Sequence, residues 1–209
     1  SVDIHKYGNA SKGASVVAFR DPDLRRLTYV VVTDGCEGLY VTPTLQGSRG
    51  GAVIAQAWAT MLRFGDAGYL QFAAEIHRSH MKCQEIINSV PGLYVLCKCH
   101  ASIVPVGSNK HSIYAIASVL EEKGWNLATG QNPPCLSICI GERHSQILQD
   151  LEQDLHSTVG FLDGNPQYKP TGTAAVYGSM STTPAAVLDE VVRRYVDMRL
   201  TVKTAGTDV

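Results

Sequence analysis

The sequence has no long hydrophobic run and no strong excess of either charge. Apolar stretches such as residues 29–32 and 53–55 are far shorter than the ~20 residues that a membrane-spanning helix requires. Lys and Arg number 18 against 19 Asp and Glu, which gives a formal net charge of -1. This balance gives no electrostatic reason to expect a nucleic acid or an anionic membrane as a partner.

The sequence also lacks a secretory signal, so its cysteines are poor candidates for a disulfide framework. We expect reduced thiols in a cytosolic compartment. The chain opens at Ser1 without a methionine and enters a dense polar motif at once, and we therefore expect it to be part of a longer protein. The six cysteines are spread along 209 residues, at Cys36, Cys83, Cys97, Cys99, Cys135 and Cys139.

Short apolar segments bounded by turns dominate the first fifty residues. The runs 14–19 and 29–32 have no polar alternation, which is typical of strands buried on both faces of a sheet. Asp21-Pro22-Asp23 predicts a turn between them, and the glycines and proline within 35–49 predict an irregular segment.

A helical period follows, because Ile54, Trp58, Met61 and Phe64 recur on one face up to a stop at Gly65. A second helix is predicted from about residue 66 to 90, and the two helices are expected to bridge two domains. The side chains that this second helix is expected to bury are Tyr69, Phe72, Ile76, Cys83 and Ile87.

The remainder alternates strands with helices. Strands are predicted at 93–96, 101–106 and 136–140, and helices at 112–122, 145–162 and from Pro184 to about residue 200, with a loop before the last. The pattern indicates an α/β or α+β chain of two parts. One apolar stripe on the helix at 145–162 comprises Leu148, Leu151, Leu155 and Val159.

The sharpest local feature is the motif Asp3-Ile4-His5-Lys6-Tyr7-Gly8-Asn9-Ala10-Ser11-Lys12-Gly13. A lysine in a small-residue loop after a short strand can reach into a cleft. Partial desolvation there would lower the pKa of its amine toward nucleophilic competence. A solvated surface lysine remains the alternative on these residues alone.

This motif resembles the lysine segment of the pyridoxal phosphate-dependent sphingosine phosphate lyases, within the fold-type-I group II decarboxylase family. The resemblance covers nearly the whole chain in order. Further matching segments are Gly38-Leu39-Tyr40-Val41-Thr42-Pro43-Thr44, Ala55-Gln56-Ala57-Trp58, Phe64-Gly65-Asp66-Ala67-Gly68-Tyr69, Lys123-Gly124-Trp125-Asn126-Leu127, Gln131-Asn132-Pro133-Pro134 and Thr171-Gly172-Thr173-Ala174-Ala175-Val176-Tyr177-Gly178.

The resemblance implies an α/β fold class. The chain would be the C-terminal part of a fold-type-I pyridoxal phosphate-dependent transferase large domain, followed by an α+β small domain. Residues 1–67 would form the end of the cofactor-binding domain, with the Schiff-base lysine loop and the bridging helix. Residues 68–209 would form the C-terminal small domain.

The resemblance also assigns roles within the lysine motif. Lys6 is expected to form the Schiff base with pyridoxal 5'-phosphate, and His5 to help hold the cofactor phosphate. A histidine satisfied by backbone groups is the alternative for His5. Lys12 is counted with Lys6 as catalytic, and its ammonium is expected to receive the substrate phosphate. Asp3 is expected to orient the loop or accept a hydrogen bond.

A second candidate loop, Gly47-Ser48-Arg49, precedes a predicted helix N-terminus, where free N–H groups attract anions. The resemblance implies that this loop is supplied across a dimer interface. Gly47 and Ser48 would then bind the cofactor phosphate and Arg49 a substrate anion, while a plain helix cap is the alternative. Tyr40 is interpreted as a packing residue.

The other histidines and cysteines do not predict a metal site. The spacing of Cys97-x-Cys99-His100 and of Cys135 and Cys139 departs from zinc patterns, and these thiols are interpreted as core residues. His77 and His80 are predicted to lie at the surface or at an interface.

The implied activity is retro-aldol cleavage of a phosphorylated sphingoid base to a long-chain aldehyde and phosphoethanolamine. The implied partners are a second copy in a homodimer with shared active sites and the N-terminal half of the enzyme, without which the chain should be inactive. The implied location is the cytoplasm, or the cytosolic face of the endoplasmic reticulum if the parent carries an anchor. An amino acid decarboxylase and a non-catalytic dimerisation domain are the alternatives.

Overall fold

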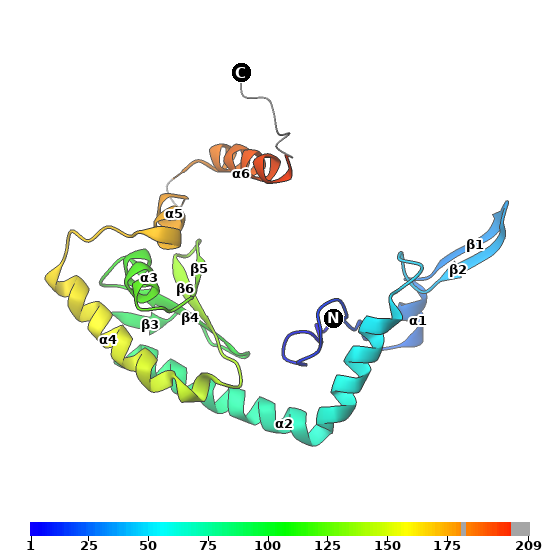
Figure 1. The fold of residues 1–209 in the computed structure, drawn as a ribbon, viewed down its shortest axis with the longest axis horizontal. Helices are drawn as coiled ribbons and strands as arrows, with labels where there is room; N and C mark the ends of the chain where they lie inside the picture. Colours follow the sequence, from blue (N-terminus) through cyan, green and yellow to red (C-terminus); the bar gives the residue numbers. More distant parts are fainter. Residues whose placement is uncertain (181–182, 202–209) are drawn as a thin grey trace, which may run out of the picture. The chain divides into compact units, whose positions relative to one another are not determined.

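The computed structural model describes residues 1–180 and 183–201. The chain divides into two compact units, Ser1–Ala74 and Glu75–Val209, here called unit 1 and unit 2. Their boundary lies within the long helix α2, Gly51–Ser89, a few residues beyond the predicted boundary at residue 67 (Figure 1). The assignment of the two parts to a large and a small enzyme domain stays a prediction.

Unit 1 contains few regular elements before α2. A short helix α1, Pro22–Arg26, begins where the side chain of Asp21 accepts a hydrogen bond from the Leu24 N–H. Strands β1, Val30–Gly35, and β2, Gly38–Thr42, form an antiparallel hairpin. The predicted turn at 21–23 is therefore the start of a helix, and part of the segment predicted as irregular is a strand.

The first apolar runs are not buried within the described residues. Within 14–19 only Val16 pairs with another strand segment, through an isolated bridge to Val2, and most of these side chains are exposed. The β1 side chains are almost all exposed as well. The reason is that β1 pairs with β2 alone, so that no second layer among the described residues covers the hairpin.

Helix α2 is interrupted at one residue. Gly65 has φ 56° and ψ -173°, a conformation outside the helix region that is essentially restricted to glycine. The predicted stop at Gly65 is therefore confirmed, although the helix resumes immediately after it.

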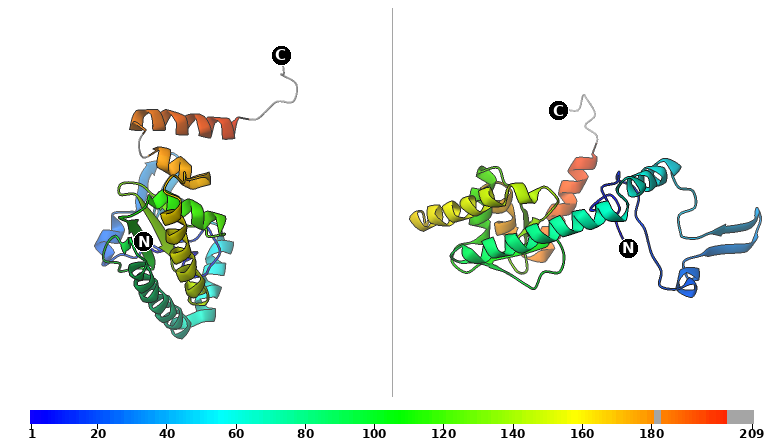
Figure 2. Two further views of the ribbon diagram at one scale, coloured as in Figure 1. Left: turned by 90° about the vertical axis from the view of Figure 1, so that its left-hand side faces the viewer. Right: turned by 90° about the horizontal axis from the view of Figure 1, so that it is seen from below.

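Unit 2 is built on a four-stranded antiparallel sheet in the order β3-β4-β6-β5. Helices α3 and α4 and the second part of α2 pack around a single hydrophobic core (Figures 1 and 2). The strands are β3 Leu93–Val95, β4 Ile103–Ser108, β5 Ala128–Gly130 and β6 Cys135–Cys139. The helices are α3 Ile113–Glu122, the 3-10 turn η1 His144–Gln146, α4 Leu148–Gly164, α5 Gly172–Met180 and α6 Ala185–Leu200.

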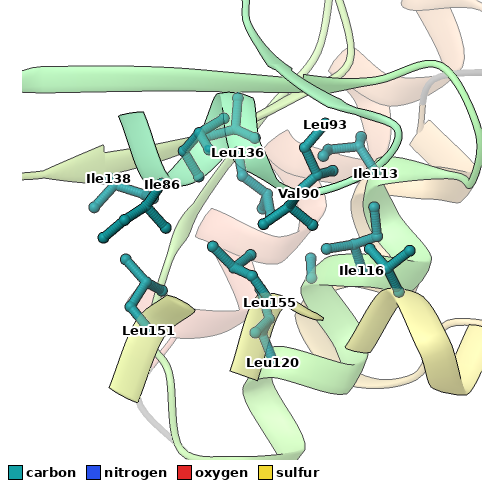
Figure 3. Close-up of a cluster of buried hydrophobic side chains, with 14 of the residues drawn as sticks. Ile86, Val90, Leu93, Ile113, Ile116, Leu120, Leu136, Ile138, Leu151 and Leu155 are labelled. Atoms are coloured by element: carbon teal, nitrogen blue, oxygen red, sulfur yellow. The ribbon is translucent and has the colours of Figure 1, made fainter. Parts of the chain in front are cut away.

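The core of unit 2 contains the stripe that the sequence predicts on α4. Figure 3 shows Leu151 and Leu155 directed toward residues of α2, α3 and β6. All four stripe residues are buried. Two elements of this unit, β5 and α5, were not predicted, and Pro184 occupies the N-cap of α6 rather than its first turn.

The predictions for the thiols and for one histidine need correction. Cys97 and Cys139 are exposed and Cys99 and Cys135 half-buried, because these residues lie at strand ends and connections rather than in the core. All six cysteines are free. His80 is buried, at 4% exposure, because it lies on the same α2 face as the core residues Cys83 and Ile87.

Within the described parts of the chain, no group of three or more His, Cys, Asp or Glu side chains could hold a metal ion. In the same residues, none of the helices has the length and apolar character needed to cross a membrane.

Candidate active site

The loop that carries Lys6 is closed by backbone hydrogen bonds. The Lys6 N–H donates to the Asp3 carbonyl at 3.1 Å, and the Ala10 N–H donates to the Ile4 carbonyl at 3.1 Å. Ile4 is the buried residue of this loop. Its burial and these bonds give Lys6 a defined backbone position.

Gly8 and Tyr69 explain why the loop takes this form. A Cβ on Gly8 would lie 2.5 Å from the Ile4 carbonyl oxygen, so a larger residue does not fit without displacing the backbone. The Tyr69 hydroxyl of α2 donates to the Gly8 carbonyl at 3.0 Å. Helix α2 thus anchors the loop from 61 residues further along the chain.

The Lys6 amine is solvated and paired with a carboxylate. Its Nζ lies 2.8 Å from Asp3 Oδ2, and the Lys6 side chain is 65% exposed. The hydrogen bond and charge of Asp3 raise the pKa of Lys6 above its ordinary value and lower the pKa of Asp3. The shift in the pKa of Lys6 is therefore opposite to the predicted one. Desolvation would lower this pKa, but its effect is smaller than that of the Asp3 carboxylate.

His5, the neighbour of Lys6, is half-buried and bonded to the backbone. Its Nδ1 lies 3.1 Å from the Ala14 carbonyl oxygen. Since a carbonyl only accepts, Nδ1 carries the proton in this contact, and Nε2 is left as the ring atom that can bind another group.

The Gly47-Ser48-Arg49 loop connects β2 to α2 and is exposed. Helix α2 begins at Gly51, which places this loop before a helix N-terminus as predicted. The Arg49 guanidinium donates from Nη2 to Thr44 Oγ1. Tyr40 lies close to the loop, because a Cβ on Gly47 would come within 2.8 Å of its hydroxyl.

The structure brings some of the predicted site residues together. Asp3 and Lys6 line one open depression with Ser1, Tyr7 and Gly8. The loop then ends at Gly13, where a Cβ would contact Val53 in the first turn of α2 at 3.4 Å.

Other predicted residues are not joined to this group. Lys12 is exposed, and among the described residues no hydrogen bond or ion pair links Lys12, Ser48 or Arg49 to Lys6. Their roles stay predictions. The sequence does not predict the hydrogen bond by which Tyr69 anchors the loop. Its only signal is that Tyr69 lies in the segment 64–69, which resembles the family.

Curated relatives match this chain along nearly its whole length, although no protein-family model matches it. Sphingosine-1-phosphate lyase from Arabidopsis thaliana is 35% identical over 198 residues, which is 94% of this chain and 36% of that protein. The enzyme of the same name from Oryza sativa is 37% identical over 88% of this chain, and that from Saccharomyces cerevisiae 34% over 94%. The chain spans about a third of the length of these relatives.

Solved structures agree with this similarity. A sphingosine-1-phosphate lyase from Burkholderia pseudomallei superposes with a TM-score of 0.79 at 28% identity, over 96% of this chain and 41% of that one. A glutamate decarboxylase from Lactobacillus brevis superposes with a TM-score of 0.60 at 19% identity, over 80% of this chain, which shows a shared fold. By sequence and by fold, the chain therefore matches a segment of the sphingosine-1-phosphate lyases, as its motifs predict.

Proposed function

We propose that this chain is part of a pyridoxal phosphate-dependent lyase that cleaves a phosphorylated sphingoid base to a long-chain aldehyde and phosphoethanolamine. The observation that carries the proposal is the 34–37% identity to sphingosine-1-phosphate lyases of plants and yeast over about nine tenths of the chain. The closed loop around Lys6 holds the amine that would react with the cofactor.

The residues of the loop fit the cofactor. An accessible primary amine and an imidazole with a free Nε2 lie side by side in one ordered loop, which suits an aldehyde and a phosphate respectively. When bound, pyridoxal phosphate supplies an electron sink for the pair released by the breaking carbon–carbon bond. Lys6 would hold the aldehyde carbon, and His5 would contact the phosphate.

Asp3 controls the protonation of Lys6 in this proposal. The ion pair at 2.8 Å keeps the amine protonated, and a protonated amine is not a nucleophile. The proton on Nζ must therefore leave before Lys6 reacts. The Asp3 carboxylate, whose own pKa is lowered, stabilises the ammonium form of Lys6, and the proton would pass from Nζ to solvent before the amine reacts.

Four further residues would bind the phosphates. Lys12 presents an exposed ammonium to the phosphate of the substrate, and Arg49 a guanidinium to the same anion. The backbone of Gly47 and the Ser48 hydroxyl, just ahead of the α2 N-terminus, would bind the cofactor phosphate together with His5.

The proposed enzyme is a homodimer with shared active sites, completed by the N-terminal part of the same protein. The support is the apolar surface of unit 1, since soluble proteins rarely leave large apolar patches uncovered. Exposed apolar residues there include Val17, Leu27, Val31, Leu39 and Val41. We place the enzyme in the cytoplasm, or on the cytosolic face of the endoplasmic reticulum, in keeping with its six free cysteines.

The test is a product assay on the full-length protein that contains this chain, with pyridoxal phosphate bound. A phosphorylated sphingoid base should yield a long-chain aldehyde, and Lys6→Ala should abolish the yield, while amino acids should release no carbon dioxide. Carbon dioxide release in place of the aldehyde would favour the decarboxylase alternative. Absence of any cofactor absorbance band would favour a non-catalytic dimerisation domain.

A further inference from the structure

One peptide unit links helix α2 to the backbone of Lys6. Its carbonyl belongs to Gly8 and accepts the hydrogen bond of the Tyr69 hydroxyl at 3.0 Å. Its N–H belongs to Asn9 and donates to the Lys6 carbonyl at 3.1 Å. Because a peptide unit is rigid and planar, the Tyr69 hydroxyl helps to fix the Lys6 backbone through it.

The backbone on both sides of this peptide is constrained. Asn9 has φ 56°, in the left-handed region, which asparagine tolerates better than most other residues with a side chain. Gly8 lies so close to Ile4 that a Cβ would come within 2.5 Å of the Ile4 carbonyl oxygen. An unfavourable conformation persists where surrounding contacts hold it, and Tyr69 supplies such a contact from outside the loop.

The break in α2 determines where the Tyr69 ring lies. This ring packs against Phe64, with centroids 5.7 Å apart, and Phe72 packs against both rings. In an unbroken helix of about 3.6 residues per turn, residues 64 and 69 would point about 140° apart, too far for their rings to pack. The non-helical backbone of Gly65 therefore makes the contact possible. Gly68 allows the close approach, because a Cβ there would lie 3.1 Å from the Phe64 Cβ.

We propose that Tyr69 is a positioning residue for Lys6 and that Gly65 acts through Tyr69. The inference rests on the proposed function, in which the Lys6 amine attaches to the cofactor aldehyde. The Lys6 side chain is 65% exposed, so its amine reaches the aldehyde in a constant geometry only if the backbone that carries it is held. Among the described residues, no hydrogen bond or ion pair joins Tyr69 to the Lys6 amine, and its effect passes through the Gly8–Asn9 peptide.

The test compares Tyr69→Phe with the parent, both as the full-length protein that contains this chain, freed of cofactor and then mixed with pyridoxal phosphate. The variant keeps the ring and removes the hydroxyl. The absorbance change on attachment should develop about fivefold more slowly, as expected for the loss of one hydrogen bond. Tyr94→Phe, at a residue of unit 2 that is 40% exposed, is the matched control and should keep the parental rate.

Amide hydrogen exchange in the cofactor-free protein gives a readout that is independent of the cofactor. The Asn9 N–H should exchange about fivefold faster in Tyr69→Phe than in the parent, because the peptide that holds it loses one of its two hydrogen bonds. The Val16 N–H, which donates to the Val2 carbonyl at 2.8 Å in the same unit, should exchange at the parental rate. A general loss of stability in unit 1 would speed both amides and would contradict a positioning role.

Gly65→Ala tests the role of the break. It should slow attachment through the same hydrogen bond, so a double variant with Tyr69→Phe should be no slower than the slower single variant. Effects that multiply would overturn the role assigned to Gly65.

An attachment rate that Tyr69→Phe leaves at the parental value would overturn the proposal. Unchanged exchange at Asn9 would overturn the route through the Gly8–Asn9 peptide. Borohydride reduction and mass spectrometry identify the attached lysine in each protein. A parent protein in which Lys6 is never labelled would overturn the proposed function instead, and the exchange rates would still test the role of Tyr69 in the loop.

Discussion

At the scale of single residues, the Asp3–Lys6 pair determines the resting state of the reactive amine. Two residues three apart in one tight loop place a carboxylate 2.8 Å from Nζ. The sequence motif predicts the lysine and its loop, but the pKa direction depends on solvent exposure. The apolar surroundings that would desolvate Lys6 are not among the described residues.

Asp3→Asn should lower the pKa of the Lys6 amine. The substitution removes the carboxylate whose hydrogen bond and charge raise that pKa above 10.5. An NMR pH titration of the Lys6 ammonium in the cofactor-free protein measures the shift. Asp23→Asn, which removes the exposed, weaker partner of Arg26, is the control and should leave Lys6 unchanged. An identical titration midpoint in Asp3→Asn would mean that the ion pair does not form.

His80 should make the protein less stable in mild acid. Burial, and to a lesser degree the charge of His77, lower the pKa of His80 below 6.5 in the folded state. The unfolded chain then binds a proton at higher pH than the folded chain. The free energy of unfolding therefore decreases as the pH falls from 6.5 toward the folded-state pKa.

Urea unfolding at several pH values below and above 6.5 measures this effect. His80→Gln should be less stable at neutral pH and lose less stability in acid than the parent, because it cannot take up the proton. The exposed His100→Gln should keep the parental slope. A slope that His80→Gln leaves unchanged would assign the acid sensitivity to other groups.

At the scale of helices and strands, the periodicity of apolar residues predicts which side chains pack locally. The predictions fail where a capping residue or a packing partner determines the element. The α4 stripe and the stop at Gly65 are both found. Helix α1 was missed although Asp21 followed by Pro22 is an N-cap signal, because the pair was interpreted as a turn. Strand β2 and helix α5 were missed because their glycines were interpreted as breakers.

Gly65→Ala should lower the free energy of unfolding, because it places a side chain at the break in α2. The residue has φ 56° and ψ -173°, and a side chain there costs roughly 1–3 kcal/mol. Gly160→Ala in the regular helix α4 is the matched control. No atom lies within 4 Å of a Cβ at that position. This control should gain about 0.5–1 kcal/mol, as glycine is a poor helix residue. Chemical denaturation measures both, and a stabilising Gly65→Ala would mean that the helix is continuous.

At the scale of the whole molecule, burial is uneven. The hydrophobic core cluster lies entirely in unit 2, whereas unit 1 buries only isolated residues such as Ile4 and Ala57. The sequence predicts two parts and the strand-helix order of the second. It also predicts a buried sheet in the first, which requires strands that the described residues do not provide.

Leu155→Ala should therefore destabilise unit 2 strongly. Leu155 is 2% exposed and packs between α2 and α3 (Figure 3), and such truncations cost about 2–5 kcal/mol. Leu45→Ala, at a residue that is 94% exposed in unit 1, should change stability by less than about 0.5 kcal/mol. Equal effects of the two variants in calorimetric unfolding would contradict the location of the core.

The central claim is that Lys6 is the residue that binds the cofactor covalently. Borohydride reduction of the full-length protein with pyridoxal phosphate bound, followed by proteolysis and mass spectrometry, tests it most directly. The pyridoxyl label is predicted on Lys6, in the peptide that contains His5 and Tyr7. A label on Lys12 or any other lysine, with Lys6 unmodified, would contradict the account.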